Sequence, residues 1–222
     1  MGEREHRQNR GTPFASFEAV TERGMFMGNR GNLRRADGTQ KVWHSCGWVC
    51  CVTSFRGRRL DLDAPNRYTP LFFSDEAVAF AAGHRPCGEC RHADYQVFKQ
   101  AWRRAFSIPD HTPLAANDMD MALHKARISR GRQLTFRAIL RDLPTGAFVT
   151  LDNQPGRAFL VRCGSLHPWS HAGYGAPMAV APDREVCVLT PLPTIEVLRA
   201  GYGVRLGSSV PEFSATGCNA QV

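Results

Sequence analysis

Long apolar runs are absent from the 222-residue chain. No segment approaches the ~18 consecutive apolar residues of a membrane-spanning helix, so we expect no membrane partner. The opening stretch MGEREHRQNRG is charged and is followed by no apolar segment of the kind found in a secretory signal. With 43% hydrophobic and 22% charged residues, the sequence predicts a folded, soluble, cytoplasmic protein.

Lysine is also scarce, because all but three of the 28 basic residues are arginine; the lysines are Lys41, Lys99 and Lys125. The net charge of +8 is concentrated in residues 1–142, which carry 23 basic and 15 acidic side chains, whereas residues 143–222 are balanced. Guanidinium groups match phosphate oxygens in pairs. The Arg-rich region 1–142 therefore predicts DNA or RNA as a partner; the alternative is that these charges only solvate a surface.

Several catalytic signatures are missing from the sequence. We find no Walker loop, no Ser-His-Asp signature and no paired catalytic carboxylates. The His-x-Glu that a zinc nucleobase deaminase needs upstream of its Pro-Cys-x₂-Cys is also missing. The deaminase interpretation is therefore rejected.

Hydrophobic patterning predicts an α+β fold. We expect strand structure over 42–55 and helices over 74–83, 93–106 and 118–128, followed by strands near 134–140, 147–151, 158–162 and 185–190 and a short helix over 194–201. The predicted architecture is a small Cys-zinc module with two helices packed on a mostly antiparallel β portion. The expected divisions are a loosely packed polar N-terminal arm (1–24), a zinc-binding module (25–110) and a strand-rich α+β portion (111–222).

Cysteines form two clusters, Cys46-Gly-Trp-Val-Cys50-Cys51 and Cys87-Gly-Glu-Cys90. In a cytoplasmic chain of this size, clustered cysteines indicate a metal site or thiol chemistry rather than a disulfide framework. A C-x₂-C turn directs two thiolates at one ion, and a second pair from distant sequence completes a tetrahedron. The sequence therefore predicts Zn²⁺ as cofactor.

The segment FFSDEAVAFAAGHRPCGECR, residues 72–91, resembles the zinc-binding domain of the Ada DNA-methylation-repair protein family. That domain has an aromatic strand, an Ala-rich helix and a Gly-(aromatic)-Arg-Pro-Cys-x₂-Cys motif, preceded by a C-x₃-C. The resemblance covers residues 42–92; the rest of the chain resembles uncharacterised bacterial proteins. It implies an Ada-like module whose zinc ligands are Cys46, Cys50, Cys87 and Cys90, with Cys51 or His44 as a substitute ligand. By the same resemblance, Cys46 takes the position of the cysteine that accepts a methyl group from a DNA phosphotriester.

Two hypotheses therefore remain open. The first is a zinc protein associated with nucleic acid, similar to a DNA repair protein, with Cys46 as a zinc-thiolate alkyl acceptor. The second is an enzyme with a structural zinc, acting on a small or nucleotide-like substrate in a pocket built from His124, Arg127, His167, His171 and Tyr174. Four thiolates around zinc favour a structural or alkyl-acceptor role, whereas three and an open position favour hydrolysis.

Overall fold

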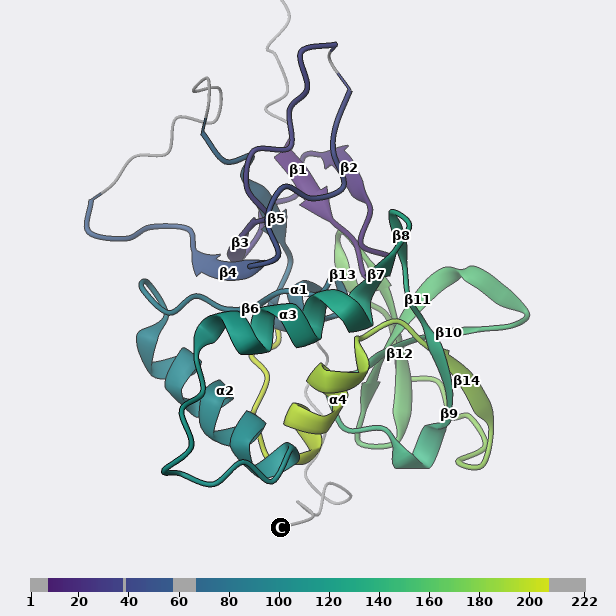
Figure 1. The fold of residues 1–222 in the computed structure, drawn as a ribbon. Helices are drawn as coiled ribbons and strands as arrows, with labels where there is room; N and C mark the ends of the chain where they lie inside the picture. Colours follow the sequence, from purple (N-terminus) through teal and green to yellow (C-terminus); the bar gives the residue numbers. More distant parts are fainter. Residues whose placement is uncertain (1–7, 38, 58–66, 208–222) are drawn as a thin grey trace, which may run out of the picture.

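The computed structural model describes residues 8–37, 39–57 and 67–207, which contain two six-stranded sheets and a short hairpin (Figure 1). The first sheet has the strand order β2-β1-β5-β3-β4-β6 and contains both antiparallel and parallel pairs. Its strands are β1 (Gln8–Gly11), β2 (Phe17–Val20), β3 (Phe26–Asn29), β4 (Val49–Val52), β5 (Leu71–Phe73) and β6 (Arg85–Pro86).

The second sheet is antiparallel throughout, with the order β13-β12-β11-β10-β14-β9. Its strands are β9 (Phe136–Ile139), β10 (Phe148–Leu151), β11 (Gln154–Arg162), β12 (Ser165–Ser170), β13 (Gly173–Tyr174) and β14 (Glu185–Val188). The separate hairpin pairs β7 (Ile128–Ser129) with β8 (Arg132–Gln133). With its helices, one mixed sheet and one antiparallel sheet, the chain has the predicted α+β fold.

The α-helices of the described chain are α1 (Glu76–Ala81), α2 (His92–Ala105), α3 (Ala116–Arg127) and α4 (Leu192–Arg199), and one 3₁₀ turn, η1, covers Leu140–Asp142. Helix α1 begins where the Asp75 carboxylate accepts a hydrogen bond from the Val78 N–H at 3.0 Å, which caps an otherwise unpaired donor. Helix α2 buries Tyr95, Phe98 and Trp102 at steps of three and four residues, as its periodicity predicts. No helix in these described segments has both the length and the apolar character needed to cross a membrane.

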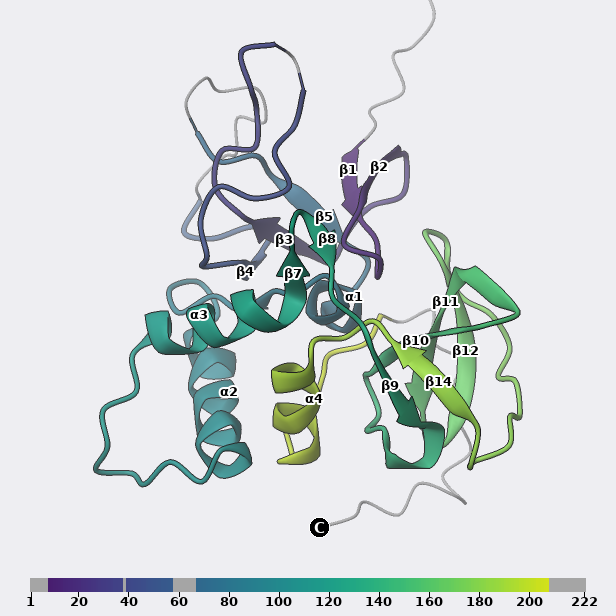
Figure 2. The same cartoon turned by 45° about the vertical axis from the view of Figure 1, so that its right-hand side comes forward.

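One hydrophobic core joins the two sheets. The buried helix α1 and Phe73 of β5 belong to the same cluster as Phe148 of β10 and Leu160 of β11. Helix α1 lies near the centre of the molecule in both ribbon views (Figures 1 and 2). The core therefore extends across residue 110, where the sequence predicts a division between two portions.

Part of the predicted polar arm is built into the first sheet. Residues 8–11 and 17–20 form β1 and β2, and β1 also pairs in parallel with β5. The Arg10 side chain is buried, and its Nη1 donates to the Glu22 carbonyl at 2.8 Å. The described part of this segment is therefore packed against the protein, which differs from the loosely packed arm expected from its polarity.

Candidate metal centre

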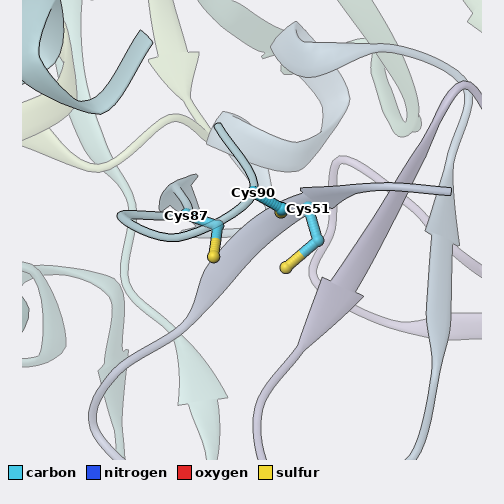
Figure 3. A group of neighbouring side chains, drawn as sticks. All are labelled: Cys51, Cys87 and Cys90. Carbon is cyan, nitrogen blue, oxygen red and sulfur yellow. The ribbon is translucent and has the colours of Figure 1, made fainter. Parts of the chain in front are cut away.

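Three cysteines lie together at one end of the first sheet (Figure 3). Cys51 comes from β4, and Cys87 and Cys90 come from the turn between β6 and α2. Their Sγ atoms all lie within 4.8 Å of one another. Thiolates are soft ligands that suit zinc. This three-cysteine group, Cys51, Cys87 and Cys90, could hold a metal ion.

Strand pairing places the turn beside the cysteine-bearing strand. Strand β6 lies parallel to β4, with Cys50 opposite Pro86. The Cys87 N–H then donates to the Cys50 carbonyl at 2.9 Å, and the Arg91 N–H donates to the Cys87 carbonyl at 3.2 Å. The backbone around the two cysteines of the C-x₂-C turn is thus held by hydrogen bonds within the protein itself.

Adjacent cysteines on β4 have different surroundings because successive side chains of a strand point to opposite faces. Cys50 is fully buried in the core shared by the two sheets, and its Sγ accepts a hydrogen bond from Arg91 Nη1 at 3.4 Å. Burial raises the pKa of the Cys50 thiol. Cys51 was predicted as a substitute ligand. It points to the turn and lies with Cys87 and Cys90, whereas Cys50 does not.

One of the three thiols, that of Cys87, has a lowered pKa. Hydrogen bonding to the Cys51 thiol lowers the pKa of Cys87 to about 5, with further support from the N–H groups of Cys90 and Glu89. The same hydrogen bond, together with burial, raises the pKa of Cys51, and burial raises that of Cys90. A metal ion would replace the protons of the two remaining thiols.

The other predicted ligands lie outside this group. Cys46 is half-buried, and its carbonyl oxygen accepts a hydrogen bond from Arg127 Nη2. His44 is exposed, and its N–H donates to the Arg30 carbonyl at 3.0 Å. The structure therefore brings together Cys87 and Cys90 as predicted, but does not add Cys46, Cys50 or His44 to them.

The residues of the alternative enzyme pocket have different neighbours. His124 Nδ1 lies 3.4 Å from Arg127 Nη2, and the His124 ring packs against Trp43 with 4.5 Å between centroids. His171 Nε2 instead lies 2.8 Å from a carboxylate oxygen of Glu18.

The two remaining residues of that predicted pocket, His167 and Tyr174, lie on strands β12 and β13 of the second sheet. The Tyr174 hydroxyl donates to Asp75 at 2.7 Å, and His167 is fully buried on β12. Of the predicted set, His124 and Arg127 contact each other, whereas His171 and Tyr174 are held by Glu18 and Asp75.

The His and the Arg of the His-Arg-Pro-Cys sequence both have structural roles inside the protein. His84 is fully buried, with its ring centroid 4.7 Å from that of Phe73. Arg85 forms a bidentate pair with Asp120, at 2.8 and 2.7 Å. Beyond the second cysteine, the buried Arg91 pairs with Glu76 at 2.5 Å.

Several arginines of the basic region are interior residues. The buried ones are Arg10, Arg30, Arg85, Arg91 and Arg127, each no more than 4% exposed. They hold carbonyls, carboxylates and aromatic rings inside the protein, so their charges do not belong to its outer surface.

Sequence reasoning did not identify Trp48, which is 1% exposed and lies among buried cations. The Arg30 and Arg127 guanidinium carbons lie 3.8 and 3.9 Å from the centroids of its ring system. Lone tryptophans carry no periodic signal, and these three residues are far apart in the sequence. Only the folded chain brings them together.

Comparisons of the chain with models of protein families, with curated proteins and with solved structures find no match.

Proposed function

We propose that this protein binds a zinc ion through Cys51, Cys87 and Cys90. The observation that carries the proposal is the convergence of three sulfur atoms within 4.8 Å from two separate segments. Zinc binds thiolate ligands in tetrahedral sites and is not redox-active. The ion would link β4 to the turn that precedes α2, and so stabilise the end of the first sheet.

Metal content of single-cysteine variants tests the proposal. We expect about one zinc per chain in the native protein, measured by elemental analysis after purification without chelator, and loss of that zinc in Cys51→Ser and Cys87→Ser. Cys187→Ser is the matched control, since Cys187 is half-buried on β14 and outside the group.

The variants Cys46→Ser and Cys50→Ser separate this ligand set from the one that the resemblance implies. Retention of zinc by both supports the three-cysteine group. Loss of zinc in Cys46→Ser with retention in Cys51→Ser would contradict it. Because Cys50 is a core residue, thermal unfolding of each variant shows whether a loss of zinc reflects a lost ligand or a lost fold.

We also propose that the zinc protein associates with nucleic acid. The support is the net charge of +8 and the basic side chains that remain exposed in residues 1–142, including Arg23, Arg35 and Lys125. Binding to a DNA or RNA duplex should weaken steeply with salt, and each lost phosphate contact should reduce the salt slope by ~0.9. Arg35→Gln should reduce it, whereas Arg157→Gln, exposed in the balanced portion, should not. Absence of binding at low salt would end this proposal.

The resemblance adds a chemical expectation, DNA repair by alkyl transfer to Cys46. In that step, the cysteine thiolate sulfur attacks a methyl carbon of a phosphotriester. The S–C bond forms, the C–O bond breaks, and the phosphodiester leaves with the electron pair. Incubation with methyl-phosphotriester DNA followed by peptide mass spectrometry checks whether one methyl group is added to Cys46 or to a member of the three-cysteine group.

A further inference from the structure

A cavity of about 400 Å³ lies away from the cysteines, between the first sheet and the β7–β8 hairpin. The hairpin reaches the first sheet in both ribbon views (Figures 1 and 2). The cationic side chains that line this cavity are Lys41, Arg127 and Arg132, and no Asp or Glu is among the described residues of its wall. We call it the basic cavity.

Buried positive charge beside the basic cavity is only partly compensated. Arg127 is 2% exposed, and its guanidinium donates to the carbonyls of Gly83 and Cys46, while its buried Nε has no hydrogen-bond partner. The nearby carboxylate of Asp120 has both oxygens bound to Arg85. The charge of Arg127 therefore has no ion-pair partner at hydrogen-bond distance within the described part of the chain.

A second buried cation lies next to the first. Arg30 is fully buried, and its guanidinium donates to His84 Nε2 and to the carbonyls of Ala15, Val42 and Ala82, all of which are uncharged. Arg30 and Arg127 both contact the Trp48 ring, and their charges repel each other. Burying two like charges is unfavourable unless an opposite charge or strong hydrogen bonds offset the lost hydration.

We propose that the basic cavity binds a phosphate monoester of mononucleotide size, with the phosphate facing Arg127, Lys41 and Arg132. A phosphate monoester carries about −1.5 to −2 charge at neutral pH and three acceptor oxygens, which suits a wall with several cations. A volume of about 400 Å³ lies within the usual range for small-ligand sites.

Apolar side chains in the same cavity support an ester with an aromatic group rather than free phosphate. Phe14, Phe17 and Val42 line it and are not fully buried, so their surfaces are accessible to a ligand. Ser16 and Gln40 add polar groups to the wall. A nucleoside monophosphate has a planar ring for the apolar side chains, polar edges for the polar ones and a phosphate for the cations of the cavity wall.

Isothermal titration of the full chain, purified without chelator, with adenosine monophosphate, adenosine and inorganic phosphate tests the proposal. We expect the monophosphate to bind at least about tenfold more tightly than adenosine, because a charge-assisted hydrogen bond contributes that much or more. Inorganic phosphate should compete with it, but bind more weakly.

Lys41→Gln and Arg132→Gln should each weaken monophosphate binding about tenfold. Arg157→Gln removes one positive charge from an exposed position of β11 outside the cavity wall, and should leave binding unchanged. Thermal unfolding confirms that each variant is folded.

Equal affinity for adenosine and its monophosphate, absence of binding, or equal weakening by all three variants would each overturn the proposal. If inorganic phosphate bound as tightly as the monophosphate, the aromatic group would contribute nothing to binding, and that part of the proposal would be overturned. No cysteine of the described segments lines the basic cavity. A failure of the zinc or nucleic-acid proposal would therefore be distinguishable from a failure of this one.

Discussion

Two bidentate arginine–aspartate pairs differ in their burial. Arg85 and Asp120 have side chains that are 5% and 9% exposed, whereas the side chains of Arg137 and Asp152 are 45% and 65% exposed. A buried ion whose partner is removed keeps its desolvation penalty without compensation, but an exposed ion recovers hydration. The two pairs should therefore respond differently to the same substitution.

We predict that Asp120→Asn lowers the free energy of unfolding by roughly 3–5 kcal/mol, because Arg85 remains charged and buried. Asp152→Asn, the matched surface change, should cost no more than about 1 kcal/mol. Urea unfolding measures both values. Equal losses in the two variants would show that burial does not decide the effect.

Individual site residues were predictable only in part. The C-x₂-C spacing identifies Cys87 and Cys90, because a tight turn alone brings their sulfurs together. The choice among Cys46, Cys50 and Cys51 depends on which face of β4 each side chain takes, and spacing along the sequence does not contain that information. Likewise, composition counts Arg30 and Arg127 as surplus charge but does not reveal that they are buried.

At the scale of elements, the first sheet depends on a close approach between glycine and an aromatic ring. Phe73 of β5 lies between β1 and β3, and a Cβ atom at Gly28 of β3 would lie 2.3 Å from Phe73 Cε2. A Cβ atom at Gly11 of β1 would lie 2.1 Å from Phe73 Cε1. Both neighbouring strands therefore need glycine opposite this ring.

We expect Gly28→Ala to lower the free energy of unfolding by about 1–3 kcal/mol, since the Phe73 ring has to shift in a packed core. Gly156→Ala on β11 is the control, because a Cβ atom there meets nothing within 4 Å. Chemical denaturation compares the two. The packing explanation would fail if Gly28→Ala were as stable as the native protein.

Clear apolar patterns made some elements predictable. The helix expected over 93–106 closely matches α2, and the strand expected over 185–190 matches β14, because their apolar residues recur at the spacing of the element. The strand expected over 147–151 matches β10, which is a short continuous buried run. Strands β1 and β3 were not predicted, since β1 is polar and β3 contains Gly28. In both, long-range pairing with β5 outweighs local preference.

For the whole molecule, the shared core should couple the two sheets. Phe148 of β10 is fully buried in one cluster with Phe73 and α1, although these residues lie on opposite sides of the predicted division near residue 110. Local sequence patterns do not show contacts of this separation, so the shared core could not be inferred from composition and periodicity. The division into 25–110 and 111–222 remains a prediction about unfolding behaviour.

We predict that Phe148→Ala lowers the free energy of unfolding by about 3–5 kcal/mol, and that hydrogen-exchange protection falls equally in β4 and β11. Val97→Ala, at a position 52% exposed on α2, should change stability by no more than about 0.5 kcal/mol. A fall confined to the second sheet would instead support two independently unfolding units.

The opposite orientations of Cys50 and Cys51 make the register of β4 critical for the metal centre. A slip of β4 by one residue against β3 would interchange the two sulfurs: the one now enclosed by hydrocarbon would face the turn, and the other would be forced into the interior. The loop that leads into this strand can change in length without that effect, provided that the pairing of β4 with β3 is kept.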